Sequence, residues 1–317
     1  MQNAIPSHAT QISMEQYVIP AKAVRQATVV IAAKAGRLGN RLFLSAYFMA
    51  NALARGYRLM NPALGEYAAF FEGSAKDPFC GFPGTEEQMD PEIAAQCRAF
   101  LEPLSGLAGI LAPGGRTLDI RHSLDAMDGV YDLNCSEFTS LLQDSRLLAV
   151  KGWKFRDDTN LVRHHEVIAR YFQPIASVRK PVESLLSEAR ALGDEVIGVH
   201  IRQGDYRDWK NGIHYFETEQ YAHWMREVSQ LDACRNPVFL VCASDSVDNA
   251  CFRGLKAVMG PGSVIGDLHA LSLCDRIMGP PSTFSTWASF HGRKPLCMLQ
   301  HNHQEIVRTD FTLHDRV

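Results

Sequence analysis

The segment HIRQGDY, residues 200–206, places a histidine, an arginine and an aspartate at the end of the apolar run VIGVHI. A guanidinium at Arg202 can bind a phosphate through two charge-assisted hydrogen bonds, and Asp205 can orient it. Gly204 permits the tight bend that this segment needs. Taken alone, Arg202 and Asp205 are equally typical of a surface ion pair worth about 0–1 kcal/mol, and His200 is typical of a core histidine.

A second cluster, the hydroxyl-rich segment PSTFST at residues 281–286, follows the short apolar run RIMG. Ser282 is a preferred N-cap residue, and the free backbone amides after it can bind an anion. Thr283, Ser285 and Thr286 add further hydroxyl groups. Taken alone, the cluster is better explained by an ordinary cap that serves only the helix. It therefore predicts a helix start at Ser282 and permits an anion site there.

Two weaker clusters complete the set of chemically active segments. The turn GRLGN, residues 36–40, has neither the glycine spacing of a dinucleotide-binding loop nor that of a phosphate loop, and Asn40 is expected to cap the following helix. Asp267 and His269 form a pair with one residue between them, as do His301 and His303, but no third ligand accompanies either pair at a recognisable spacing. We therefore predict no metal site.

These clusters must be positioned by the elements around them, and the pattern of those elements alternates between strand and helix. The ranges predicted as strands are 28–34, 57–60, 196–201, 237–244, 263–267, 276–279 and 295–299, and the ranges predicted as helices include 161–172, 218–230, 246–258 and 282–290. A further helical region is expected around 86–104. Such alternation is typical of a parallel sheet covered on both faces, with ligands at the carboxyl ends of the strands.

Length and composition limit the class of protein. The chain has 317 residues, which suggests about two domains. Its formal net charge of −3 argues against a nucleic-acid partner that binds through net charge. No apolar stretch approaches the roughly 20 residues of a membrane span, and the N-terminus does not resemble a signal peptide. The eight cysteines form no CxxC pair, which favours free thiols in a reducing cytoplasm.

Taken in order, the four clusters resemble the fucosyltransferases that use GDP-fucose. HIRQGDY is similar to the H-x-R-x-G-D-Y signature of that superfamily, and most closely to its α1,2 branch. GRLGN resembles its N-terminal glycine segment, DLHALS (267–272) a D-x-H-x-L-S segment, and PSTFSTWA (281–288) its closing motif. The resemblance covers most of residues 28–299, whereas residues 73–195 offer little to match.

The resemblance implies an α/β fold of the GT-B type, in which two Rossmann-like domains with parallel sheets face each other across a cleft. We expect a loose arm at 1–26, an acceptor-side domain at 27–175 and a GDP-sugar-binding domain at 176–317, with the boundary bracketed by Pro174 and Pro181. The partners implied are a GDP-sugar donor and a glycan or glycoconjugate acceptor. The implied location is the cytoplasm, with peripheral attachment at the inner membrane face as an alternative.

The same resemblance implies a role for each matching residue. Arg202 would be the catalytic arginine that binds the β-phosphate and stabilises the departing GDP, and no metal or other cofactor is expected. His200 and Asp267 would contact the guanine side. The remaining nucleotide-sugar contacts implied by the match are Ser282, Thr283, Ser285, Thr286, Gly36, Arg37, Gly39 and Asn40, with Asp245 as a weaker candidate. The reaction implied is an inverting transfer that forms an α-fucoside.

Two positions depart from the family pattern and keep alternatives open. Gln203 stands where a second arginine is frequent, and Thr286 stands where the α1,2 branch often has an aromatic residue. The first departure allows the same fold with another nucleotide sugar as donor. No general base is identified, which allows a non-catalytic protein that binds nucleotide sugars or glycans. A nicotinamide oxidoreductase is a remote alternative because the glycine spacing is wrong.

Overall fold

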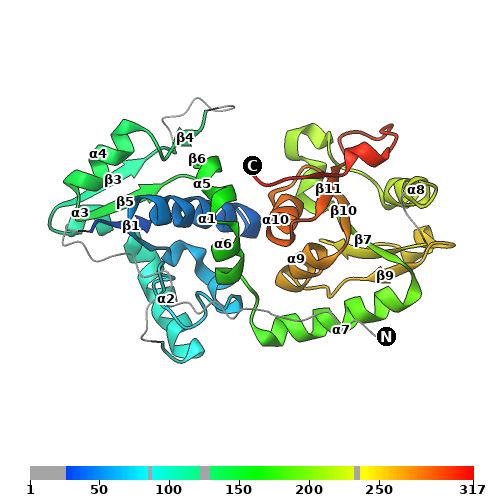
Figure 1. The fold of residues 1–317 in the computed structure, drawn as a ribbon, viewed down its shortest axis with the longest axis horizontal. Coiled ribbons are helices and arrows are strands. Elements are labelled where there is room, and N and C mark those ends of the chain that lie inside the picture. The colour runs from blue at the N-terminus through cyan, green and yellow to red at the C-terminus, as the bar shows by residue number, and fades with distance from the viewer. Residues whose placement is uncertain (1–25, 85–87, 122–128, 232–235) are drawn as a thin grey trace, which may run out of the picture.

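The computed structural model describes residues 26–84, 88–121, 129–231 and 236–317, and the arm predicted for residues 1–26 lies outside this range except for Gln26. Two parallel sheets lie side by side, one in each half of the chain (Figure 1). The predicted α/β class with parallel sheets is confirmed.

The N-terminal half is built on a four-stranded sheet in the order β2-β1-β5-β3, with every pair parallel. Its strands are β1 (Thr28–Ile31), β2 (Arg58–Met60), β3 (Gly115–Asp119) and β5 (Leu147–Lys151), and the short pair β4 (Tyr131–Asp132) and β6 (Phe155–Arg156) stands apart. Its helical elements are α1 (Leu38–Arg55), η2 (Pro62–Phe70), α2 (Pro91–Ser105), α3 (Ala108–Leu111), α4 (Ser136–Asp144), α5 (Asp158–Arg163) and α6 (His165–Tyr171). Val29, Val30 and Ile31 of β1 are buried, which explains why this run forms an internal strand of the sheet.

The C-terminal half is built on a six-stranded sheet in the order β12-β11-β10-β7-β8-β9. All its pairs are parallel except β11 with β12. Its strands are β7 (Glu195–Ile201), β8 (Pro237–Ala243), β9 (Ala257–Met259), β10 (Arg276–Gly279), β11 (Pro295–Met298) and β12 (Thr312–Leu313). Its helices are α7 (Ala176–Leu192), α8 (Thr218–Ser229), α9 (Val264–Leu273) and α10 (Thr283–Gly292), with short 3-10 turns η3 (Gly204–Arg207), η4 (Trp209–Gly212), η5 (Asn249–Phe252) and η6 (Arg308–Asp310). The predicted strands at 196–201, 237–244, 276–279 and 295–299 are confirmed.

Two predictions in the C-terminal half are wrong. The segment predicted as a strand at 263–267 begins helix α9, because Ser263 acts as its N-cap and accepts a hydrogen bond from the Gly266 amide. The segment predicted as a helix at 246–258 instead forms the short turn η5 and the edge strand β9. A short apolar run does not by itself distinguish a strand from the start of a helix.

The connection between the halves also differs from the predicted pattern. The single helix expected at 161–172 is divided into α5 and α6 at His164. The next helix, α7, continues through Pro181, so this proline does not mark a break in the chain. Helix α7 packs on α9 and on β7 and β8, so its main packing is within the C-terminal half, while its Arg179 pairs with Glu72 of the N-terminal half at 2.7 Å.

Helices α1 and α10 join the two halves in the middle of the molecule (Figure 1). The Phe43 ring of α1 meets the Trp287 ring of α10 edge to face, with 5.1 Å between centroids. The N-termini of the two helices also touch, since a Cβ added to Gly39 would lie 2.7 Å from the backbone of Thr283. A glycine at position 39 is therefore what allows the two helix N-termini to approach this closely.

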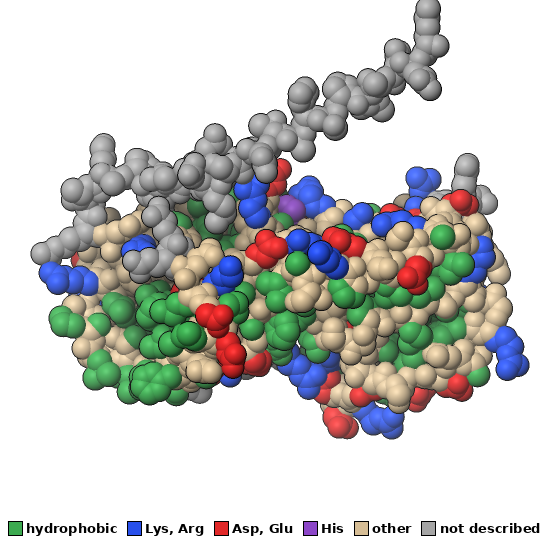
Figure 2. Space-filling view, turned by 90° about the horizontal axis from the view of Figure 1, so that it is seen from below, with side chains coloured by type: hydrophobic (Ala, Val, Ile, Leu, Met, Phe, Trp, Pro, Cys, Tyr) green, Lys and Arg blue, Asp and Glu red, His purple; other side chains and the backbone are tan. Residues whose placement is uncertain are grey.

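The outer surface of the N-terminal half is partly apolar. Hydrophobic side chains gather at this end of the molecule (Figure 2), where Phe100, Ile110 and Leu111 are exposed at 70%, 73% and 72%. Among the described residues, no helix is both long enough and apolar enough to cross a membrane. The seven cysteines that lie in the described ranges are all unpaired.

Candidate functional site

A cavity of about 990 Å³ opens where the carboxyl ends of the two sheets face the N-termini of α1 and α10. It is lined by residues of both halves. Of the predicted site residues, those that line it are Gly36, Arg37, Gly39, Asn40, His200, Arg202, Asp267, Ser282, Thr283 and Thr286. The structure thus brings together segments that are more than 200 residues apart in the sequence.

Two helix N-termini point their free amide groups toward this cavity. Helix α10 has Ser282 as its N-cap, as predicted, and the Ser282 hydroxyl accepts a hydrogen bond from the Phe284 amide. Helix α1 begins at Leu38 with Arg37 as its N-cap and without a side-chain cap, so the prediction that Asn40 caps it is wrong. Neither helix has an acidic residue in its first turn. The partial positive charges of both termini are therefore available to an anion.

Arg202 lies at the end of β7, where a single carboxylate holds it in place. Its Nη2 is 2.7 Å from Oδ1 of Asp205, and Nη1 of Arg37 is 3.4 Å from the same oxygen. Asp205 therefore connects cationic groups from the two halves of the chain. The Arg202 side chain is only 16% exposed, and its guanidinium lies 5.4 Å from the centre of the Tyr206 ring. Its buried Nε has no hydrogen-bond partner among the described residues.

His200 and Asp267 form a less polar part of the same cavity. Burial lowers the pKa of His200 to about 3, with a smaller effect from Arg202, so the imidazole is neutral at physiological pH. Its ring centre lies 4.9 Å from that of Phe284. Burial raises the pKa of Asp267 to about 6, against the lowering effect of the Gly262 amide, which donates to Oδ1 at 2.9 Å. A buried carboxyl group whose pKa is raised in this way is typical of a functional site.

Three predicted residues lie differently from the others. Ser285 is fully buried, and its hydroxyl is within hydrogen-bond distance of the carbonyls of Pro280 and Ser282. Asp245 accepts a 2.8 Å hydrogen bond from the Ser244 hydroxyl and is not among the residues that line the cavity. Thr286 lines the cavity, but its hydroxyl donates to the Ser282 carbonyl at 2.9 Å. The hydroxyls of Ser285 and Thr286 therefore stabilise the start of α10.

Gln203, which departs from the family pattern, turns away from the cavity. Its side-chain amide donates to the carbonyl of Phe216 at 3.1 Å, and it is not among the lining residues. The glutamine therefore fixes the loop after β7. Within the described ranges, no group of three histidine, cysteine or acidic side chains is arranged to hold a metal ion.

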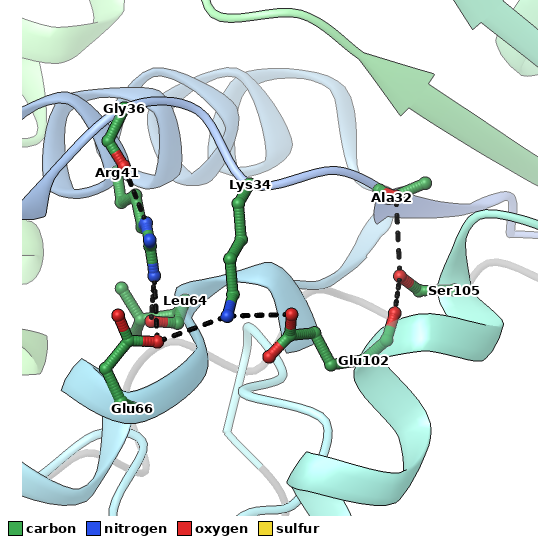
Figure 3. Close-up of polar contacts among 8 residues, drawn as sticks. All are labelled: Ala32, Lys34, Gly36, Arg41, Leu64, Glu66, Glu102 and Ser105. Carbon is green, nitrogen blue, oxygen red and sulfur yellow. Dashed lines mark hydrogen bonds and ion pairs between the residues drawn. The ribbon is translucent and has the colours of Figure 1, made fainter.

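A charged network supports the loop between β1 and α1 (Figure 3). Lys34 is 2.8 Å from a Glu102 oxygen and 3.3 Å from a Glu66 oxygen, and Arg41 is 3.1 Å from that same Glu66 oxygen. Arg41 also donates through Nε to the Gly36 carbonyl at 3.1 Å. The network thus links α1, η2 and α2 beneath the glycine turn. Arg41 is buried, so this link orders the turn that carries Arg37.

Several residues that line the cavity were not predicted from the sequence. They include Tyr67, Trp153, Tyr206, Trp209, Lys210, Ser244, Val264 and Arg316. Tyr206 and Trp209 lie within or close to the HIRQGDY segment, and their nearness in sequence could have indicated them. Tyr67 lies in η2 and Trp153 in the loop between β5 and β6, and neither segment carries a motif, so the sequence offered no signal for them.

One family model matches the C-terminal part of the chain. Residues 164–310 match the model of glycosyl transferase family 11, a range that contains Arg202, Asp267 and Ser282. A search of curated protein sequences finds no match.

Among solved structures, the chain is similar to an arginine-to-lysine mutant of FUT1 from Arabidopsis thaliana in complex with GDP, with a TM-score of 0.56 and 14% identity, over 96% of this chain and 77% of that one. It is similar to the fucosyltransferase NodZ from Bradyrhizobium, with a TM-score of 0.51 and 16% identity, over 87% and 96% of the two chains. A structure of the α-1,6-fucosyltransferase NodZ soaked with GDP-fucose gives 0.54 and 17%, over 86% and 95%. At these identities the likeness shows a shared fold. The family match confirms the predicted class of enzyme, a glycosyltransferase.

Proposed function

We propose that the protein transfers fucose from GDP-fucose to a hydroxyl of a glycan or glycoconjugate, with inversion at the anomeric carbon and an α1,2 linkage. The observation that carries the proposal is the meeting of two cavity-facing helix N-termini with Arg202 in one cavity. We further infer a GT-B arrangement, in which residues 27–175 and 176–317 form the domains on either side of this cavity.

The diphosphate fits the cationic part of the cavity. Breaking the bond between the sugar and GDP builds negative charge on the β-phosphate and positive charge on the sugar ring. Arg202 can donate two hydrogen bonds to the phosphate, and the amides at the start of α1 and α10 can donate others. Because Asp205 fixes Arg202 at 2.7 Å before any ligand binds, these donors need little reorganisation. Fixed donors directed at developing charge are the largest usual source of rate enhancement.

The nucleobase fits the less polar part. The guanine edge carries N–H donors, and the buried carboxylate of Asp267 can accept from two of them. Neutral His200, held beside Phe284, lines this part of the cavity and offers its ring as a packing surface for the base. A uracil edge offers a single N–H donor between two carbonyls, so it would leave Asp267 poorly satisfied. This arrangement favours a guanosine donor over a uridine donor.

The acceptor hydroxyl attacks the anomeric carbon from the side opposite GDP. As the new C–O bond forms, the bond between the sugar and GDP breaks, GDP leaves with its electron pair, and the hydroxyl proton passes to the solvent. We propose that no metal takes part, because Arg202 and the helix termini already supply the positive charge that the leaving group requires. Gln203 lies outside the cavity, so the glutamine there does not by itself favour a different donor.

The direct test is a transfer assay with GDP-fucose, GDP-mannose and UDP-glucose against a panel of oligosaccharides, with and without EDTA. We expect transfer from GDP-fucose alone, unaffected by EDTA, and an α1,2-linked fucoside when the product is analysed by NMR. A product from UDP-glucose, or a β-fucoside, would contradict the proposal. GDP binding without turnover on any acceptor would favour a non-catalytic binding protein.

A further inference from the structure

Donor-binding chemistry accounts for the cavity wall formed by β7, α9 and α10, but it leaves two aromatic side chains of the N-terminal half unexplained. Tyr67 of η2 and Trp153 of the β5–β6 loop both line the cavity. We propose that these two rings, which we call the acceptor wall, bind the pyranose rings of the acceptor by stacking. This inference rests on the proposed function and deepens it by assigning the acceptor subsite and its chemical class.

Both rings of the acceptor wall are supported in the same way. A buried arginine guanidinium lies over one face of each ring, with Arg156 at 4.9 Å from the centre of the Trp153 ring and Arg41 at 4.9 Å from that of Tyr67. Arg156 is itself held between Trp153 and Tyr47, whose ring centre is 5.0 Å away. Its Nη1 also donates to the Trp153 carbonyl at 2.9 Å. The rings are therefore fixed before any ligand binds.

The loop that presents Trp153 is shaped for this position. Gly152 has a φ of +128°, and a Cβ at this residue would lie 2.5 Å from Cγ1 of Ile120. A side chain there would displace the loop, so the glycine is required for its path. The indole nevertheless remains 39% exposed, although tryptophan is one of the largest apolar side chains. Ligand binding is the simplest explanation for a rigid indole that remains exposed in a cavity.

The chemistry of the wall fits a sugar. One face of a pyranose presents C–H groups, which pack on an aromatic face, while its hydroxyls remain free for polar partners. Lys210 and Arg316, which also line the cavity, carry N–H groups that can donate to sugar hydroxyls. Because the donor groups Arg202 and Asp267 come from the other half of the chain, a sugar on the acceptor wall faces the bound donor. A neutral, extended oligosaccharide is the acceptor class that this wall suits.

The test compares W153A, W153F and Y67A with the wild type, using lactose, N-acetyllactosamine, chitobiose and cellobiose as probes. F70A is the matched control, since Phe70 is also 39% exposed and is not among the cavity-lining residues. We expect W153A and Y67A each to raise the acceptor KM about tenfold, as expected for losing an aromatic contact. W153F should raise it less, and F70A should have no effect. The Kd for GDP should stay within about twofold in every variant.

Three results would overturn the acceptor wall. An unchanged acceptor KM in W153A and Y67A would show that sugars bind elsewhere. A weakened Kd for GDP would show that the rings bind the guanine instead. If the wild type transfers fucose to none of the probes, saturation-transfer NMR of the same sugars with the GDP-saturated protein measures whether they bind without reacting. Sugar binding that W153A abolishes would support the wall while the proposed reaction fails, and no sugar binding at all would overturn the wall.

Discussion

The contact between Gly39 and Thr283 gives the sharpest test of how the two halves meet. Replacing Gly39 with alanine adds one methyl group, and its carbon would lie 2.7 Å from the carbonyl carbon, the carbonyl oxygen and Oγ1 of Thr283. Carbon atoms in favourable contact are about 3.5–4.0 Å apart. Two of the three atoms belong to the backbone, so a side-chain rotation cannot relieve the clash. The N-termini of α1 and α10 must separate by about 1 Å to restore normal contact distances.

Two effects on stability oppose each other in G39A. Overpacking of this kind destabilises a protein by about 1–3 kcal/mol, whereas alanine stabilises a helix by about 1 kcal/mol relative to glycine. The net loss of unfolding free energy is then about 1 kcal/mol. Catalysis is more sensitive, because a 1 Å displacement of groups that orient a substrate can reduce the rate about a hundredfold. We therefore expect a small loss of stability and a large loss of kcat.

The assay combines urea denaturation with steady-state transfer from GDP-fucose. G106A is the matched control, since a Cβ at Gly106 would meet nothing closer than 3.8 Å and its φ of −61° suits alanine. The control should keep full activity and be at least as stable as the wild type. If G39A were as active and as stable as G106A, the helix N-termini would not be in contact in solution, and the shared anion site would be wrong.

Two further variants test the polar groups of the cavity. R202K keeps the charge but removes the planar fork that Asp205 holds, and we expect kcat to fall about 10²-fold in steady-state assays; an unchanged kcat would mean that Arg202 does not contact the leaving group. Burial raises the pKa of Asp267 to about 6, so folding favours the protonated form of this carboxyl group. The stability that the group contributes is therefore fully present below about pH 4 and is lost as the pH rises through about 6. D267N should therefore stabilise the protein by about 2–3 kcal/mol at pH 7.5, but not at pH 4, while weakening GDP binding. Denaturation at both pH values and GDP titration measure these effects, and equal stabilisation at pH 4 and pH 7.5 would show that burial of the Asp267 charge is not its cause.

Neighbouring residues in the sequence are enough to predict part of the site where the residues that can do chemistry also mark the start or the end of a helix or strand. The residue type of Ser282 predicts an N-cap, the apolar run before Arg202 predicts a strand, and the structure has both. Because the carboxyl ends of parallel strands meet at one edge, the clusters at 200–206 and 281–286 could be expected to lie together. The meeting of the 36–40 turn with them followed from the family resemblance.

Other features depend on packing that a single sequence does not show. Ser263 could start a strand, as predicted, or a helix, and the tertiary structure selects the helix α9. The Ser285 hydroxyl turns into the helix rather than toward the cavity, which depends on a rotamer. Trp153 lies in a short loop without a motif, and its place in the cavity depends on Arg156, which lies against its ring.

The measurement that tests the central claim most directly is a thermal-shift titration with GDP, GDP-fucose, GDP-mannose, UDP-glucose and NAD. A ligand at about 100 times its Kd stabilises the native state by about 2.7 kcal/mol, which raises the unfolding midpoint. We predict a shift with GDP and GDP-fucose that EDTA does not change and that R202A reduces. A shift with UDP-glucose or NAD alone, or none with GDP, would contradict the assignment of this cavity to GDP-fucose.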